Sequence, residues 1–203
     1  MLHYETIDSP ALGLLKQLQQ IPAFAELRLA GGTSLALQTG HRKSVDIDLF
    51  GIIRGDEYEI SNALHKLGKF TTIKKSTNIG IYIINGIKAD IVNYSYPWLQ
   101  EAVIEDGLRL AGDKDIAAMK LAAITGRGTK KDFIDLFFLL KKYTLREMLN
   151  LYNKKYEDGS ELLVLKSLSY FLDAEKDDSP IMLQAIDWDA IKSHILNQVA
   201  NVG

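Results

Sequence analysis

The chain has 203 residues, of which 47% are hydrophobic and 25% are charged, as in an ordinary globular protein. It contains no cysteine, which excludes disulfides, thiolate-bound zinc and cysteine nucleophiles. A net charge of −2 argues against a protein that coats long nucleic acids non-specifically.

No apolar run approaches the roughly 18 residues that a membrane span requires. The first residues also lack the basic and apolar regions of a signal peptide. We therefore expect a cytoplasmic protein without a membrane partner.

The first half of the chain alternates between helix and strand patterns. Ser9 and Pro10 are typical of a helix start, and Pro22 ends the segment that follows. Asn85 and Gly86 predict a two-residue hairpin turn. Periodicity predicts strands over 27–30, 45–50, 70–75, 79–84 and 87–94, and further helices over 33–39 and 56–67.

The second half shows only helical periodicity with charged faces. The predicted helices span 113–125, 130–143, 145–156, 161–174 and 187–202. The predicted fold class is α+β, in which a domain of residues 1–112 holds a mixed β-sheet flanked by helices and a domain of residues 113–203 is a helical bundle.

A glycine pair and an aspartate pair bracket one short segment of the first half. Gly31 and Gly32 precede a helix, where backbone N–H groups favour phosphate. Asp46 and Asp48 then share one face of a predicted strand. Neighbouring carboxylates repel unless a cation lies between them, and their oxygens suit Mg²⁺. The segment predicts a phosphate site and a metal site, although solvated acids at a strand end give the same pattern.

Asp90 supplies a third acid on a later strand. If that strand is an antiparallel neighbour of the one with Asp46 and Asp48, three carboxylates converge and can hold one or two Mg²⁺. Asp90 is then also the acid best placed to take a proton from an attacking hydroxyl. A lysine or arginine filling the space between these acids would contradict the metal site.

Charged residues recur in the helical half at spacings that allow contacts. Lys120 lies in an otherwise apolar stretch, so its side chain either reaches water or points into a cleft. Arg127 follows near the end of that stretch. Lys131 and Asp135 are four residues apart on one helical face, a spacing typical of weak surface salt bridges.

Together these blocks resemble the nucleotidyltransferase superfamily with the polymerase β-type fold. More specifically, residues 27–142 resemble the AbiEii/AbiGii family, the toxin halves of bacterial abortive-infection toxin–antitoxin systems. The superfamily pattern is present as Gly31-Gly32, thirteen further residues, Asp46-Ile47-Asp48 and later Asp90. The family-specific blocks are Gly32-Thr33-Ser34-Leu35, His41-Arg42-Lys43-Ser44, Ala118-Met119-Lys120-Leu121 with Arg127, and Lys131-Asp132-Phe133-Ile134-Asp135-Leu136.

The resemblance implies a role for each matching residue. Asp46, Asp48 and Asp90 would bind Mg²⁺, with Asp90 completing the metal site or acting as the base. Asp135 would orient Lys120 and Arg127 or take part in catalysis. The residues implied in nucleotide binding are Gly31, Gly32, Thr33, Ser34, Arg42, Lys120, Arg127 and Lys131.

The implied reaction is in-line attack of an acceptor hydroxyl on the α-phosphorus of an NTP, with release of pyrophosphate. Implied acceptors include the 3′ end of tRNA, and a separately encoded antitoxin would neutralise the toxin. Two alternatives stay open: the same chemistry on a small molecule such as an aminoglycoside, and a catalytically silent binding module with the same fold.

The sequence predicts least about the surface that would bind an acceptor, because only about 60 residues follow Tyr143 and many relatives are longer. The lysine pairs at 141–142 and 154–155 could form a basic patch for RNA. Paired lysines in helices are more often a solvated face.

Overall fold

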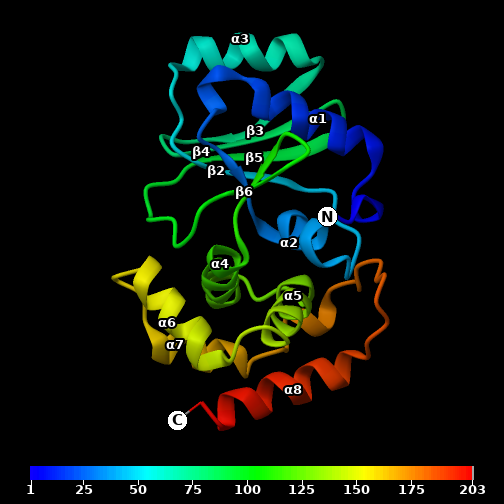
Figure 1. The fold of residues 1–203 in the computed structure, drawn as a ribbon, viewed down its shortest axis with the longest axis vertical. Helices are drawn as coiled ribbons and strands as arrows, with labels where there is room; N and C mark the ends of the chain where they lie inside the picture. Colours follow the sequence, from blue (N-terminus) through cyan, green and yellow to red (C-terminus); the bar gives the residue numbers. More distant parts are fainter. Residues whose placement is uncertain (203) are drawn as a thin grey trace. The chain divides into compact units, whose positions relative to one another are not determined.

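A mixed sheet of seven strands organises the first of two units in the computed structural model, which describes residues 1–202 (Figure 1). The first unit comprises residues 1–38, 44–95 and 102–111, and the second comprises residues 39–43, 96–101 and those from 112 onward. Within residues 1–202, no helix combines the length and apolar character that crossing a membrane requires.

The strands follow the order β3-β4-β5-β2-β1-β7-β6 across the sheet. Neighbours are antiparallel except for β2 with β5 and β1 with β7, which are parallel. The strands are β1 (Arg28–Leu29), β2 (Ile47–Gly51), β3 (Phe70–Lys75), β4 (Ile79–Ile84), β5 (Ile87–Asn93), β6 (Val103–Glu105) and β7 (Leu108–Leu110). The predicted fold class, a mixed sheet followed by a helical bundle, is confirmed.

Two hairpins show how turn residues shape the sheet. Asn85 (φ 50°) and Gly86 (φ 85°) join β4 to β5, as predicted from the Asn-Gly pair. Asp106 (φ 52°) and Gly107 (φ 78°) join β6 to β7 in the same way. This second hairpin was not predicted, although Asp-Gly between two short apolar runs is the sequence signal for it.

The helices of the first unit are α1 (Ser9–Gln20), α2 (Gly31–Thr39) and α3 (Glu57–Leu67). In Figure 1, α1 and α3 cover one face of the sheet. The residue that caps α1 is Asp8, whose side chain accepts from the N–H of Ala11, so Ser9 lies inside the helix rather than at its cap. The side chain of Asp56 caps α3 by accepting from the N–H of Glu59, and the Glu59 carboxylate in turn accepts from the N–H of Asp56.

The core of this unit forms where the apolar stripes of α1 and α3 meet the sheet. Strand alternation directs every second side chain of β2 and β5 into this core and the residues between them to the other face. The buried residues are Leu14, Leu15 and Leu18 of α1, Leu64 of α3, Ile47 and Leu49 of β2, and Ala89 and Ile91 of β5. Asp48 and Asp90 therefore lie on the face that is turned away from the core.

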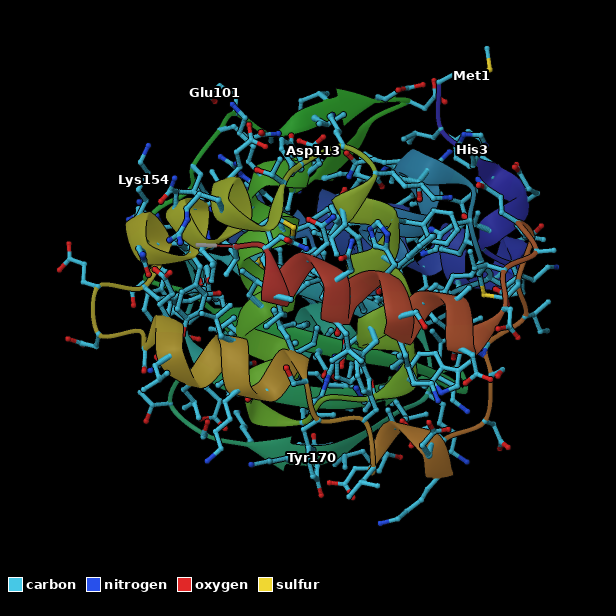
Figure 2. The ribbon with its side chains drawn as sticks, turned by 90° about the horizontal axis from the view of Figure 1, so that it is seen from below. Met1, His3, Glu101, Asp113, Lys154 and Tyr170 are labelled. Carbon is cyan, nitrogen blue, oxygen red and sulfur yellow. The ribbon has the colours of Figure 1, made fainter. Side chains whose placement is uncertain are left out.

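The second unit is helical. Its helices are α4 (Asp113–Gly126), α5 (Lys130–Leu140), α6 (Leu145–Lys155), α7 (Glu161–Leu168) and α8 (Trp188–Ala200). α4 packs against α5, α6 and α7, while α8 packs against α5 and α7 (Figure 2). The helix predicted over 161–174 ends at Leu168, and a short 3₁₀ helix (Ala174–Lys176) follows after a break.

The connection between α2 and β2 also belongs to the second unit. The N–H of Lys43 donates to the carbonyl of Ile181 at 2.8 Å, and the N–H of Leu183 donates to the carbonyl of His41 at 2.9 Å. These backbone bonds hold residues 39–43 in the second unit, which positions His41 and Arg42 for the contacts described below.

Candidate functional site

Asp48 and Asp90 lie side by side in the first unit. β2 and β5 are neighbours, and their register pairs Asp48 with Asp90, so the two side chains share a face of the sheet. Asp46 precedes β2 by one residue. The predicted adjacency of the two strands is confirmed, but the predicted antiparallel direction is wrong. The hairpin makes β4 the antiparallel partner of β5, and the chain returns through α3 and β3 so that β5 runs parallel to β2.

Lys88 places a positive charge beside these acids. It lies two residues before Asp90 on the same face of β5, and its Nζ is 2.8 Å from Asp90 Oδ2. Burial alone would lower the pKa of Lys88, but the hydrogen bond to Asp90 and the charges of Asp90, Asp48 and Asp46 raise it. This lysine was not predicted, although its spacing from Asp90 in a strand is a readable signal. Its presence argues against a metal site that is already formed.

The chemistry of the same acids nevertheless suits a divalent cation. Within residues 1–202, no three His, Asp or Glu side chains are grouped closely enough to hold a metal ion, so the carboxylates would have to draw together around one. Asp90 Oδ1 is buried without a hydrogen-bond partner, and the Lys88 ammonium already stands where the acids attract a cation. A set of carboxylate oxygens suits Mg²⁺, which completes its shell with water and phosphate.

The start of α2 brings the backbone against Asp48. Gly31 has a φ of 64°, in the left-handed region that favours glycine. A Cβ at this position would lie 2.5 Å from Asp48 Oδ2. The N–H of Ala30 donates to the carbonyl of Asp48 at 2.8 Å. Glycine at position 31 is therefore what lets this carboxylate lie against the first turn of α2.

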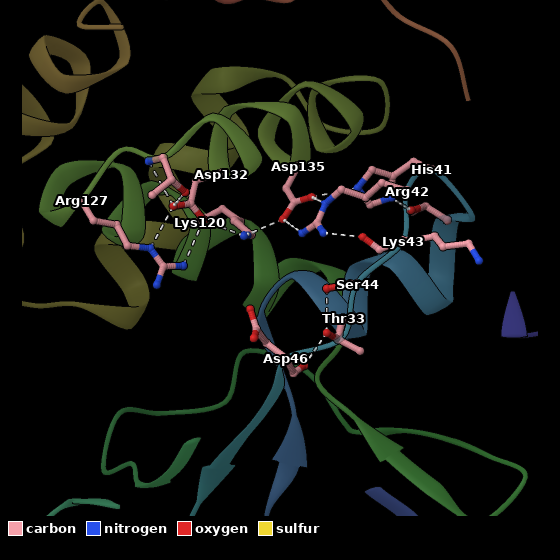
Figure 3. A network of polar contacts seen from close by, with 12 residues as sticks. Thr33, His41, Arg42, Lys43, Ser44, Asp46, Lys120, Arg127, Asp132 and Asp135 are labelled. Carbon is pink, nitrogen blue, oxygen red and sulfur yellow. Dashed lines mark hydrogen bonds and ion pairs between the residues drawn. The ribbon is translucent and has the colours of Figure 1, made fainter. Parts of the chain in front are cut away.

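The hydroxyls of Thr33 and Ser34 stabilise this turn from inside. Thr33 donates to the carbonyl of Asp46 and lies 2.8 Å from the hydroxyl of Ser44 (Figure 3). Ser34 donates to the carbonyl of Ala111 at 3.3 Å. Both side chains are buried. Any phosphate contact of this segment, including Gly32, would come from backbone N–H groups, and the predicted nucleotide-binding role stays a prediction.

Replacing Gly31 with alanine is expected to destabilise the first unit. The variant Gly31→Ala combines a strained φ with a Cβ that displaces the Asp48 carboxylate, at a cost of about 1–3 kcal/mol. The melting temperature measured by circular dichroism should fall by roughly 2–10 °C.

The matched control is Gly13→Ala in α1, where a Cβ meets nothing within 4 Å. It should leave the melting temperature unchanged or raise it, because alanine favours the helix over glycine. Equal melting temperatures for Gly31→Ala and the wild type would contradict the account of this turn.

In the second unit, Asp135 of α5 is the acceptor for three side chains (Figure 3). Arg42 donates to its two carboxylate oxygens from Nε at 2.7 Å and Nη2 at 2.9 Å. His41 Nε2 lies 2.8 Å from Oδ1, and Lys120 Nζ lies 2.6 Å from Oδ2. Asp135 has no exposed surface and its partners are buried, so the cluster forms a charged network inside the unit.

Asp132 extends this network by one turn of α5. It accepts from Lys120 Nζ at 2.9 Å and from Arg127 Nε at 2.9 Å. The hydroxyl of Thr129 donates to it at 2.6 Å as part of the cap of α5. Asp132 was not predicted as a site residue, although it lies in the same sequence block as Asp135.

The charges of the network stabilise one another. Burial alone would raise the pKa of Asp135, but the charges of Lys120 and Arg42 and bonds from His41 and Arg42 hold it well below its usual value. Burial lowers the pKa of His41 against the opposing effect of Asp135. His41 is therefore neutral at pH 7, so that Nε2–H donates to Asp135 and Nδ1 accepts from the hydroxyl of Thr39 at 2.6 Å.

These contacts differ from the pattern expected for the helical half. The side chain of Lys120 is only 4% exposed, so it neither reaches water nor lines an open cleft. Two buried carboxylates neutralise its charge. Asp135 contacts Lys120 and Arg42, whereas Arg127 contacts Asp132. Lys131 is partly exposed in the first turn of α5. The sequence predicted a surface salt bridge between Lys131 and Asp135. This prediction is wrong for Asp135, because its side chain is buried. The nucleotide-binding roles of Arg42, Lys120, Arg127 and Lys131 stay predictions.

The basic patch proposed for an acceptor is wrong at Lys155. Its Nζ is buried, lies 2.7 Å from Asp115 Oδ1, donates to the carbonyl of Pro97, and lies 4.7 Å from the ring centroid of Trp98. The buried carboxylate supplies the counter-ion that permits a buried ammonium. Lys154 lies at the edge of the unit in Figure 2.

Two comparisons concern sequence. The family model described as "Nucleotidyl transferase AbiEii toxin, Type IV TA system" matches residues 13–110 and 114–201. An uncharacterised protein of Aquifex aeolicus (strain VF5) is 41% identical over 155 residues, which cover 73% of this chain and 75% of that protein.

Solved structures share the fold. JHP933 from Helicobacter pylori matches with a TM-score of 0.60 and 22% identity, covering 97% of this chain and 93% of that one. A putative nucleotidyltransferase from H. pylori matches with a TM-score of 0.61 and 19% identity over 96% and 95%. MenT4, a nucleotidyltransferase toxin from Mycobacterium tuberculosis H37Rv, matches with a TM-score of 0.63 and 16% identity over 95% and 82%.

Proposed function

The chain belongs to the AbiEii family of nucleotidyl transferase toxins of type IV toxin–antitoxin systems, and we propose from this premise that it is a Mg²⁺-dependent NTP transferase. In the proposed reaction, an acceptor hydroxyl oxygen forms a bond to the α-phosphorus of an NTP. The bond from that phosphorus to the bridging oxygen of the β-phosphate breaks, and pyrophosphate leaves. We assign the proton of the acceptor hydroxyl to Asp90.

The pairing of Asp48 with Asp90 across β2 and β5 is the observation that carries this proposal. The pairing of β2 with β5 runs without a register shift from Ile47 to Gly51, so the backbone holds both carboxylates on one face. Asp46, Asp48 and Asp90 would hold Mg²⁺, which neutralises charge on the phosphates when it is bound. The partnerless Oδ1 of Asp90 supports this assignment, because a buried carboxylate oxygen is stabilised by a ligand.

The turn at Gly31 contributes to phosphate binding in this proposal. The first N–H groups of α2 lack partners within their own helix and carry partial positive charge. We propose that the backbone at Gly31 and Gly32 binds phosphate oxygens there, while Thr33 and Ser34 keep the turn in place through their internal bonds.

The second unit contributes a rigid charged network in this proposal. Asp135 orients Arg42 and Lys120, and Asp132 orients Arg127, which has a side chain that is 60% exposed. Of these cations, Arg127 is the one with surface available for a phosphate. Membership of a toxin–antitoxin family supports an antitoxin encoded by another gene, and we propose the 3′ end of tRNA as the acceptor.

A labelling experiment tests the reaction and the acceptor together. The full chain is incubated with each α-³²P-labelled NTP in Mg²⁺ or in EDTA, with total tRNA or with a mixture of aminoglycosides. We expect labelled tRNA and released pyrophosphate in Mg²⁺ but not in EDTA. Periodate oxidation of the tRNA, which destroys its 3′-terminal diol, should prevent labelling.

The other outcomes separate the alternatives. Labelled aminoglycoside with unlabelled tRNA would replace the proposed acceptor by a small molecule. Nucleotide binding without release of pyrophosphate for any acceptor would contradict the enzymatic proposal and favour a binding module.

A further inference from the structure

We propose that Lys88 is the built-in counter-ion of the three carboxylates Asp46, Asp48 and Asp90, and that a divalent cation enters this cluster by displacing the Lys88 ammonium from Asp90. The displacement step rests on the metal site of the proposed function. The counter-ion role does not, because it concerns the metal-free protein.

The geometry of β5 places the ammonium at one of the carboxylate oxygens that a metal would use. Lys88 and Asp90 alternate onto one face of the strand, and Nζ lies 2.8 Å from Asp90 Oδ2. Asp48 is the register partner of Asp90 on β2 and shares that face. Asp90 thus carries one oxygen bound to a lysine and one buried oxygen without a partner. The Lys88 ammonium therefore pairs with one of the two oxygens of this carboxylate.

The charge balance favours a cation at this position. Asp46 and Asp48 both act on Lys88 electrostatically, in addition to its direct partner Asp90. Three carboxylates near one another repel, and a positive charge among them lowers that repulsion. A divalent ion offers twice the charge and direct coordination to the oxygens, so it competes with the ammonium for the same groups.

Lys88 is also able to leave. Its side chain is 43% exposed, compared with 20% for Asp90. The ammonium is a compact charge on a flexible four-carbon stem, and it is strongly hydrated once it turns into solvent. Lys120 and Lys155 differ from Lys88 in this respect. Their side chains are only 4% and 0% exposed, so their ammonium groups cannot turn into solvent.

The test removes the charge and measures metal binding directly. Lys88→Met keeps the length of the stem, Lys88→Arg keeps the charge, and Lys74→Met on the exposed face of β3 is the matched control. Binding of Mn²⁺, as a probe for Mg²⁺, is followed by electron paramagnetic resonance on the full chain. We expect Lys88→Met to bind Mn²⁺ roughly fivefold more tightly or better, as the loss of one competing charge at about 4 Å implies. Lys88→Arg and Lys74→Met should bind Mn²⁺ like the wild type.

The counter-ion role is tested separately, in EDTA. Lys88→Met should lower the melting temperature of the wild type by a few degrees. In the Asp90→Asn background, Lys88→Met should lower the melting temperature by clearly less, because the carboxylate charge that Lys88 neutralises is already absent.

The outcomes distinguish the two proposals. Wild-type Mn²⁺ affinity in Lys88→Met, or weaker binding, would overturn the displacement while leaving the metal site intact. Absence of Mn²⁺ binding in every variant would overturn the metal site, and the displacement with it. Equal effects of Lys88→Met in both backgrounds would overturn the counter-ion role.

Discussion

Asp48→Ala is expected to abolish nucleotide transfer while the fold remains intact. Asp48 is the carboxylate that shares a register position with Asp90 and lies against the turn at Gly31. Loss of a ligand that stabilises charge on the transferring phosphate costs several kcal/mol, which corresponds to a rate reduced roughly a thousandfold. The melting temperature should stay within about 2 °C of the wild type, because the substitution also removes one of three mutually repelling charges.

The measurement is the initial rate of pyrophosphate release, with circular dichroism as the check on folding. Glu57→Ala is the matched control, since this acid on α3 is 78% exposed and pairs with the exposed Lys75. It should retain the wild-type rate. Transfer at the wild-type rate by Asp48→Ala would remove the basis of the proposed active site.

Asp135→Asn is expected to cause the largest loss of stability among single charge changes in the second unit. The substitution keeps the size of the side chain but leaves Lys120 and Arg42 without the carboxylate that both contact. Breaking a buried ion pair from one side costs about 3–5 kcal/mol, because the remaining charge stays buried. For a chain of this length the melting temperature should fall by roughly 10 °C.

The dependence on pH provides a second measurement. The pKa of Asp135 in the folded chain lies well below its usual value, so the stabilisation is complete above the unfolded pKa of about 3.9 and is lost as the pH falls below it. In Asp135→Asn, the free energy of unfolding should therefore depend less steeply on pH in this acidic range. The control Asp173→Asn removes an exposed pair with Lys176 and should change the melting temperature by no more than about 2 °C. A wild-type melting temperature for Asp135→Asn would contradict the buried network.

Both predictions depend on the difference between a charge on a partly exposed strand face and a charge buried inside a helical unit. The acids of the first unit lie on the face turned away from the core, so a ligand or Lys88 can neutralise them. Asp132 and Asp135 are buried and already neutralised by the chain. The first group is suited to binding and the second to holding other residues in place.

Local patterns in the chain predicted the features that depend on nearby residues. The strands at 70–75 and 79–84 follow from runs rich in β-branched and aromatic residues, and the turn between the second of them and β5 follows from the preference of Asn85 and Gly86 for positive φ. The helical second half follows from its 3.6-residue period. The resemblance of four separate sequence blocks, rather than any one of them, also predicted the family to which the chain belongs.

Tertiary structure decided which distant residues meet and in which direction. β5 runs parallel to β2, against expectation, because strand direction depends on the path through α3, β3 and β4. The contact of Arg42 with Asp135 joins residues 93 positions apart, and no local period encodes such a pairing. The sequence did not predict where the lysines at 88, 120 and 155 lie: one is beside the acids of β2 and β5, and two are buried. Their environments follow from the carboxylates that the fold brings to them.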